Sequence, residues 1–162
     1  SPHSFLIAQH MPEKFTRTFA ERLDKRGGVR THEAWHDAQA SAGQAFVCPG
    51  GHCMSLLRVS GELRTRVVRP DATDRYVPSG DRLFESVADL MLERTVAVVL
   101  TGMGDDALRG AKRVRDVGGM VLAESEASAA VFGMPGSVIR AGLATHVLSV
   151  PEIAKLLSSL PR

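Results

Sequence analysis

The chain has 162 residues and a net charge of +2, with 44% apolar and 23% charged residues, values that exclude an intrinsically disordered chain and a strongly basic nucleic-acid binder. No apolar run reaches the ~20 residues that cross a bilayer, and no signal-peptide pattern opens the sequence. We therefore expect a cytoplasmic globular protein, in which Cys48 and Cys53 are free thiols.

Strand and helix signals alternate from the amino terminus. The apolar segment from Phe5 to Gln9 is typical of a buried strand in a parallel sheet. A helix is predicted over 14–25, because apolar residues recur every four positions and would form one stripe facing the core. Two weaker strands are predicted over 29–33 and 44–48. The helical stripe consists of Phe15, Phe19 and Leu23.

An antiparallel hairpin interrupts this alternation. The segments 54–59 and 62–68 flank Ser60-Gly61, a two-residue pair typical of a hairpin turn, and a polar loop follows over 71–78. Several arginines fall on the hairpin, where they form either a solvated face or a docking face for an acidic partner. They are Arg58, Arg64, Arg66 and Arg69.

The second half of the chain returns to alternating helices and strands. The pattern predicts an α/β fold with a doubly wound, mostly parallel sheet in three αβα layers. We also expect residues 1–162 to form one domain. The last helix is predicted to carry Pro151 at its first position. The other elements are a helix ending near 93, a strand over 96–100, a helix starting at 107, a strand over 120–123, a helix over 135–141 and a strand over 146–150.

Two polar residues follow predicted parallel strands. His10 comes just after the first strand and Asp106 just after the strand over 96–100, and ligands of open parallel sheets bind beyond the carboxyl ends of the strands. A His–Asp pair is the orienting half of a nucleophilic triad. The alternatives are a helix N-cap for Asp105 or Asp106, and an ordinary loop position for His10.

Two glycine-containing segments offer further chemistry. The turn Thr101-Gly102-Met103-Gly104 can present backbone N–H groups to an oxyanion or a phosphate, although a nucleotide fingerprint would need glycine in place of Ala107. A nucleotide-binding module therefore stays open as an alternative. Cys48-Pro49-Gly50-Gly51-His52-Cys53 offers at most three metal ligands, so we interpret it as a proline-glycine turn rather than a zinc site.

Four sequence blocks, in this order, resemble the catalytic domain of the bacterial chemotaxis protein-glutamate methylesterase. The first is Gln9-His10-Met11-Pro12, and the second is Pro78-Ser79 followed by Asp81 and Leu83-Phe84. The third runs from Leu100 through Thr101-Gly102-Met103-Gly104 to Asp105-Asp106. The fourth runs from Glu126 to Gly133-Met134-Pro135. The resemblance extends from one end of the chain to the other.

This resemblance implies hydrolysis of γ-glutamyl methyl esters on methyl-accepting chemotaxis receptors, and in many members deamidation of receptor glutamines, without a cofactor. The family uses a Ser–His–Asp triad. Carried over by position, His10 is the general base, Asp106 is its orienting carboxylate, and the backbone N–H of Met103 helps to hold the oxyanion.

The chain departs from the family pattern in two places. The family's nucleophile lies in a Gly-Ala-Ser-Thr-Gly-Gly loop after a first strand, and no such motif occurs in the 162 residues. We therefore expect the first strand, the nucleophile loop and the first helix to be missing. The chain is then either part of a genuine methylesterase or a non-catalytic receptor-binding module. In addition, Cys53 stands before Met54 where the family usually has histidine.

Overall fold

The computed structural model describes all of residues 1–162. The chain divides into two compact units, Ser1–Ser86 and Val87–Arg162. Each unit has its own three-stranded parallel sheet, and the first unit also has a two-stranded antiparallel sheet. Mostly parallel strands with helices between them confirm the predicted α/β class.

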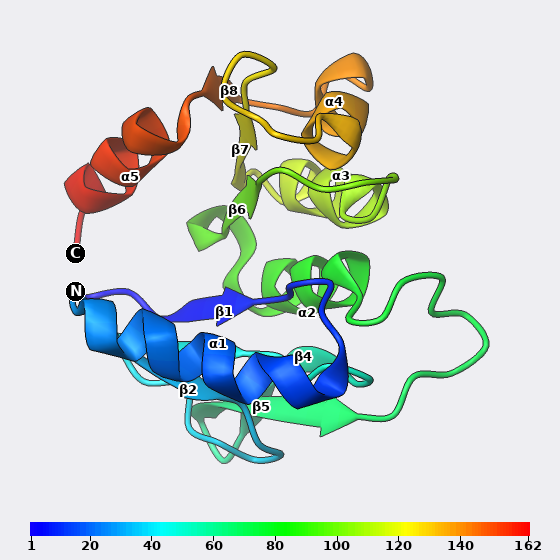
Figure 1. Cartoon of the computed structure of the whole chain (residues 1–162). Coiled ribbons are helices and arrows are strands. Elements are labelled where there is room, and N and C mark those ends of the chain that lie inside the picture. Colours follow the sequence, from blue (N-terminus) through cyan, green and yellow to red (C-terminus); the bar gives the residue numbers. More distant parts are fainter. The chain divides into compact units, whose positions relative to one another are not determined.

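The parallel sheet of the first unit has the strand order β1-β3-β2. Its strands are β1 (Phe5–Ile7), β2 (Arg30–Glu33) and β3 (Gln44–Val47), and all neighbours are parallel. The helix α1 (Glu13–Arg26) connects β1 to β2 and packs along β2 (Figure 1). The predicted helix and strands are therefore present, each shifted by no more than two residues at its ends.

The face that α1 buries differs from the predicted apolar stripe. Thr16 and Ala20 are the buried residues of the helix, whereas Phe15 is 48% exposed and has the Lys14 ammonium 5.4 Å from its ring centroid. Phe19 and Leu23 of the predicted stripe are half-buried beside them, so the stripe is only partly turned inward. The strand β1 was predicted to be buried, but it is only half-buried, because it forms one edge of its sheet.

The Thr16 hydroxyl links α1 to the sheet and to the loop that follows β3. Its oxygen lies 2.6 Å from Glu33 Oε2, to which it donates, and it accepts the Gly50 N–H at 3.1 Å. Gly50 approaches the start of α1 so closely that a Cβ atom there would lie 2.6 Å from the Glu13 backbone. Glycine is therefore required at position 50 by the close approach of two backbones.

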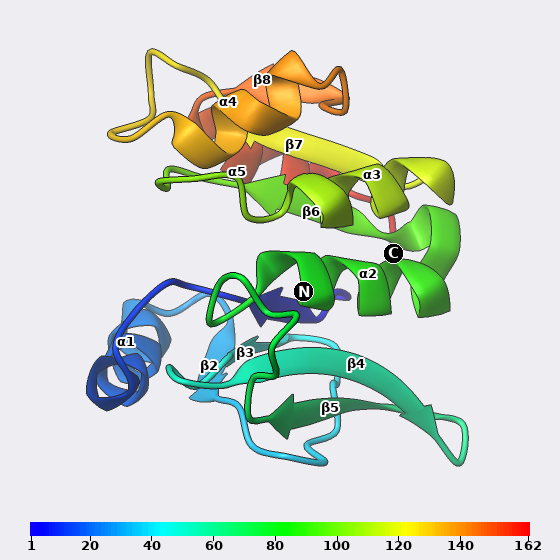
Figure 2. The same cartoon turned by 90° about the vertical axis from the view of Figure 1, so that its right-hand side faces the viewer.

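The predicted hairpin is confirmed in detail. Strands β4 (Cys53–Val59) and β5 (Glu62–Val68) pair antiparallel, and Ser60 and Gly61 have φ values of 50° and 84° (Figure 2). Positive φ at both central residues is the type I′ geometry that matches the twist of a hairpin. Arg64 on β5 is paired with Glu62 at 2.8 Å and with Asp37 at 3.6 Å, so part of the arginine set is neutralised locally.

A cluster of three rings covers part of the first unit. The Trp35 ring lies 5.9 Å from His32 and 6.0 Å from Phe46, both in edge-on geometry, and the indole is 54% exposed. The buried Thr65 hydroxyl donates to the Trp35 carbonyl at 2.7 Å. The loop after β2 is therefore held against the hairpin, with its tryptophan at the surface.

Helix α2 (Gly80–Met91) and a short 3₁₀ turn (Leu92–Arg94) lead into the second unit, whose parallel sheet has the order β6-β7-β8. The central strand is buried except at its first residue, Met120, whereas β8 is a largely exposed edge. The elements are β6 (Val96–Val99), α3 (Leu108–Asp116), β7 (Met120–Glu124), α4 (Gly133–Arg140), β8 (His146–Leu148) and α5 (Val150–Ser159).

Helix α5 begins with a complete capping box. The Ser149 side chain accepts the Glu152 N–H, and the Glu152 carboxylate accepts the Ser149 N–H at 2.7 Å. The hydrogen bonds that the Glu152 carboxylate makes with Ser149, above all with its backbone N–H, lower the pKa of Glu152. Because Ser149 is the N-cap and Val150 the first helical residue, Pro151 stands at the second helical position rather than at the predicted first.

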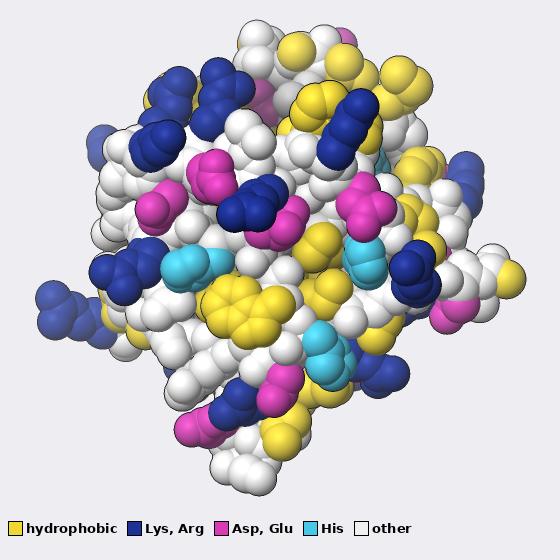
Figure 3. All heavy atoms as spheres, turned by 60° about the horizontal axis from the view of Figure 1, so that its bottom comes forward, with side chains coloured by type: hydrophobic (Ala, Val, Ile, Leu, Met, Phe, Trp, Pro, Cys, Tyr) yellow, Lys and Arg dark blue, Asp and Glu magenta, His cyan; other side chains and the backbone are white.

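No helix of the chain combines the length and the apolar character needed to span a membrane. On the face shown in Figure 3, basic and acidic side chains are interspersed with histidines and exposed apolar groups. No charge of a single sign covers that face, in line with the small net charge of +2.

Replacing Thr16 with valine tests the link between α1 and the sheet. Thr16→Val keeps the shape of the side chain but removes the hydroxyl that donates to Glu33 and accepts the Gly50 N–H. We expect the free energy of unfolding to fall by about 2 kcal/mol. Urea unfolding followed by far-ultraviolet circular dichroism measures the change. Thr18→Val, on the exposed face of the same helix, is the control and should leave the stability unchanged. Equal stabilities of the two variants would show that the hydroxyl network contributes nothing.

Candidate functional site

In the first unit, His10 lies at the edge where two parallel strands end. Ile7 pairs with Val47, and the Cys48 N–H donates to the Ile7 carbonyl at 2.8 Å, so the segments after β1 and β3 leave the sheet together. His10 follows β1 by three residues and its side chain is exposed. The predicted position of His10 just beyond the carboxyl end of a parallel strand is therefore confirmed.

Tyr76 stacks on the His10 ring. The two ring centroids lie 5.5 Å apart and the planes are nearly parallel, with an angle of 8°. The Arg75 guanidinium lies 5.4 Å from the centroid of the Tyr76 ring. Sequence reasoning missed this contact, because Tyr76 belongs to the polar loop over 71–78, where nothing in the residue pattern points to a partner.

Charged hydrogen bonds hold the loop that carries Tyr76. Arg82 of α2 pairs with the carboxylates of Asp71 and Asp74, and the Asp74 side chain is only 4% exposed. The Asp71 N–H donates to Asp74 Oδ2 at 2.8 Å. Hydrogen bonds from Thr73, with a smaller contribution from Arg82, lower the pKa of Asp71. The loop is thus anchored to the first turn of α2.

The segment Cys48 to Cys53 forms the predicted turn, in which the His52 N–H donates to the Pro49 carbonyl at 3.2 Å. Both cysteines are free, as expected, and fully buried. Burial, with the nearby Cys53 and Glu33, raises the pKa of the Cys48 thiol to about 12. Burial also raises the pKa of the Cys53 thiol. No cluster of three potential metal-ligating side chains occurs in the structure.

In the second unit, the turn after β6 is fastened to the segment that leads into α4. The Thr101 hydroxyl accepts the Val131 N–H at 2.7 Å, and the Gly102 carbonyl accepts the Met134 N–H at 2.8 Å. A Cβ atom at Gly133 would lie 2.8 Å from the Gly102 carbonyl oxygen. Only glycine at position 133 allows this approach, so the glycine in the fourth sequence block keeps the turn in place.

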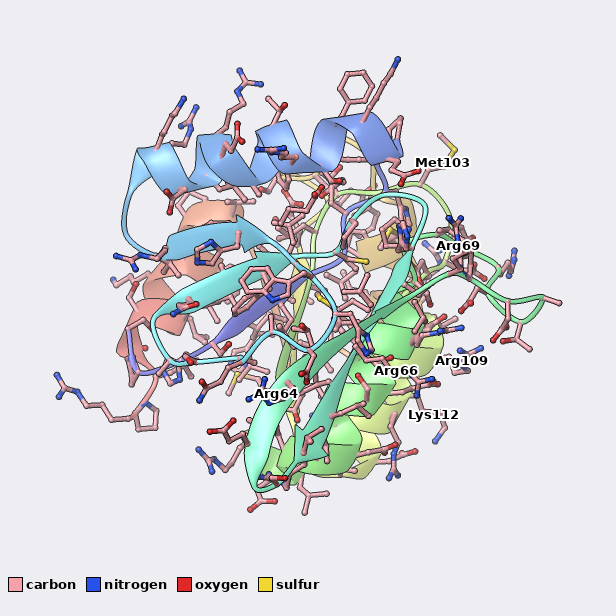
Figure 4. The ribbon with its side chains drawn as sticks, turned by 90° about the horizontal axis from the view of Figure 1, so that it is seen from below. Arg64, Arg66, Arg69, Met103, Arg109 and Lys112 are labelled. Carbon is pink, nitrogen blue, oxygen red and sulfur yellow. The ribbon has the colours of Figure 1, made fainter.

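Met103 stands at the tip of this turn. Its side chain is 79% exposed and projects outward (Figure 4), and Met103 makes none of the hydrogen bonds that fasten the turn. Arg64 and Arg66, labelled in the same view, project from β5 of the first unit. The turn therefore presents the backbone of Met103 on a rigid support.

Asp106 is almost fully buried, with 1% of its surface exposed. Its Oδ1 accepts the Ala107 N–H at 2.8 Å, and Ala107 adopts a left-handed conformation with φ of 74°. Helix α3 begins at Leu108, and Ala107 rather than Asp105 or Asp106 occupies its N-cap position. A left-handed alanine costs roughly 1–2 kcal/mol, a strain that is typical of functional sites.

Glu124 is a second buried carboxylate beside the same turn. It is 3% exposed, its Oε2 accepts the Thr101 N–H at 2.7 Å, and its Oε1 accepts the Ser128 hydroxyl at 2.9 Å. Sequence reasoning missed it, although a carboxylate directly after the predicted strand over 120–123 was a usable signal. Glu124 fixes the backbone where β6 passes into the turn.

Comparison with known proteins decides the family. A family model described as CheB methylesterase matches residues 1–157. The chain belongs to the CheB methylesterase family. This membership confirms the resemblance that the four sequence blocks indicated.

Curated CheB relatives match the chain over nearly its whole length. A protein of Geobacter sulfurreducens named protein-glutamate methylesterase/protein-glutamine glutaminase 3 is 42% identical over 154 residues, which cover 95% of this chain and 42% of the relative. A Myxococcus xanthus protein, numbered 1 under the same name, is 40% identical over 157 residues, covering 97% of this chain and 46% of the relative. The chain thus spans less than half the length of these relatives.

The crystal structure of the Thermotoga maritima CheB methylesterase catalytic domain has the same fold. The TM-score is 0.93 at 34% sequence identity, and the match covers 96% of this chain and 82% of that chain. The structure of this chain thus brings Tyr76 to His10 in the first unit, and Met103, Asp106 and Glu124 to one turn region in the second. The pairing of His10 with Asp106, which lie in different units, stays a prediction.

The role of Glu124 can be tested by removing its carboxylate. In Glu124→Leu the Thr101 N–H loses its acceptor, and we expect a stability loss of about 1–3 kcal/mol. Amide hydrogen exchange at Thr101, read by nuclear magnetic resonance, should become faster. Glu124→Gln retains an acceptor oxygen and should restore protection, and Glu126→Leu, at an exposed neighbouring position, is the control. Unchanged exchange in Glu124→Leu would contradict the proposed support of the turn.

Proposed function

We propose that the chain supplies the base and the acid of a Ser–His–Asp triad that hydrolyses γ-glutamyl methyl esters of proteins. The burial of Asp106 beside the Met103 turn carries the proposal, because a buried carboxylate held by the Ala107 N–H is suited to orient an imidazole. The chain belongs to the CheB methylesterase family, and its relatives are named protein-glutamate methylesterases. In this proposal the nucleophilic serine is not one of residues 1–162, because the family's serine loop has no counterpart in this sequence.

His10 acts as the general base in this mechanism. It takes the serine proton as the serine oxygen attacks the ester carbonyl, and it returns that proton to the methoxide, which leaves as methanol. The product of this half-reaction is an acyl-enzyme. In the second half, His10 takes a proton from water, the resulting hydroxide attacks the acyl group, and serine regains its proton. The products are a glutamate side chain and the free enzyme.

Asp106 orients the imidazole and stabilises its charged form. A carboxylate bound to one ring nitrogen fixes the tautomer in which the other nitrogen accepts the serine proton. The hydrogen bond from the Ala107 N–H to Oδ1 restricts the Asp106 side chain, and its burial strengthens the interaction with an imidazolium.

The Met103 N–H stabilises the negative oxygen of the tetrahedral intermediate. Preorganised backbone donors are effective because they do not need to reorient during the reaction. The hydrogen bonds of Thr101 and Gly102 to Val131 and Met134, together with the Thr101–Glu124 bond, provide this preorganisation.

The same groups support deamidation of protein glutamines. With a primary amide in place of the ester, His10 delivers its proton to the departing nitrogen, which leaves as ammonia, and the acyl-enzyme is identical. The relatives carry the name glutaminase beside methylesterase. We place the activity in the cytoplasm, on the cytoplasmic helical region of methyl-accepting chemotaxis receptors, and it requires no cofactor.

The triad is tested in the natural full-length protein that contains this chain. His10→Gln and Asp106→Asn should each lower kcat by about 10³- to 10⁴-fold, because the oxyanion turn and substrate binding remain. Release of methanol from methylated receptor measures the activity. His146→Gln, on the exposed strand β8, is the matched control and should keep full activity.

Two outcomes would contradict this proposal in different ways. A full-length protein that binds methylated receptor but releases no methanol would indicate the alternative, a receptor-binding module without catalysis. An active protein in which His10→Gln retains full kcat would show that another residue is the base.

A further inference from the structure

We propose that Tyr76 is a positioning residue for His10, a role that rests on the proposed function of His10 as general base. Tyr76 acts through the face of its ring and not through its hydroxyl. It limits the orientations that the imidazole can adopt, so that the ring nitrogens keep the directions that proton transfer requires.

The stacking geometry is suited to this role. A centroid distance of 5.5 Å lies within the range of favourable offset stacking, and an angle of 8° makes the two ring planes nearly parallel. Rotation of the imidazole about its Cβ–Cγ bond would turn a ring edge toward the tyrosine and break this contact. The tyrosine face thus selects one plane for the imidazole.

His10 needs such support because its own backbone gives little. Strand β1 has only three residues, His10 follows it in an irregular segment, and the side chain is exposed. The Tyr76 stack therefore adds a tertiary contact that reaches the ring itself. Misplacement of a reacting group by about 1 Å can cost a factor of 10² in rate, so a fixed ring orientation has catalytic value.

Tyr76 is itself held in place. Arg82 donates to Asp74 Oδ1 at 3.0 Å and also pairs with Asp71, which anchors the loop to α2. The Arg75 guanidinium contacts the half-buried Tyr76 ring. A continuous series of contacts therefore leads from helix α2 through the ion pairs of the loop to the imidazole.

The test compares two variants at position 76 in the natural full-length protein. Tyr76→Leu removes the flat ring at similar size, and we expect kcat for methanol release to fall by about 10- to 100-fold with KM nearly unchanged. Tyr76→Phe keeps the stacking face and should stay close to the wild-type kcat. Trp35→Leu, which removes a ring from His32 instead, is the matched control and should leave kcat unchanged.

A second measurement does not depend on catalysis. Stacking on an aromatic face shifts the ring-proton resonances of His10 upfield in nuclear magnetic resonance spectra. We expect this shift in the wild type and in Tyr76→Phe, and its loss in Tyr76→Leu. Circular dichroism verifies folding, and Tyr76→Met takes the place of Tyr76→Leu if the leucine variant does not fold.

Several outcomes would overturn the inference. Wild-type kcat in Tyr76→Leu would show that the stack has no influence on the base. A loss in Tyr76→Phe as large as in Tyr76→Leu would assign the effect to the hydroxyl. Failure of the proposed function is read from a different variant. If His10 is not the base, His10→Gln keeps full activity, whatever residue stands at position 76.

Discussion

The in-register parallel pairing of β6 with β7 is the constraint on which the second unit's candidate site depends. Val99 pairs with Ala123, so the chain leaves both strands at the same level of the sheet. Glu124 directly follows Ala123, and its carboxylate reaches the Thr101 N–H just beyond the end of β6. A shift of one residue would turn Glu124 to the other face of the sheet and leave the turn without this support.

In the first unit, sheet pairing accounts for only part of the arrangement. The register of β1 with β3 brings the segment after β1 beside the turn that begins at Cys48. It does not orient the His10 ring, because β1 ends three residues earlier. From outside the sheet, the Tyr76 ring stacks on the His10 ring, and ion pairs hold the loop that carries Tyr76. The two units thus hold their functional groups by different means, one by register and the other by a charged loop.

Sequence periodicity predicted every α-helix and β-strand, because buried strands appear as apolar runs and helices often end at a glycine, and both are local patterns. Periodicity was only partly right about the face that α1 buries: Phe19 and Leu23 are half-buried beside the buried Thr16 and Ala20, whereas Phe15 is exposed. His10 and Asp106 could be picked out, since each follows a strand. Tyr76 could not, because its stacking on His10 is a contact between distant segments set by loop geometry.

Trp35 gives the chain a natural optical reporter. It is the only tryptophan, it lies in the first unit, and its half-exposed indole contacts His32 and Phe46. Intrinsic indole fluorescence therefore responds to loosening of the aromatic cluster in the first unit.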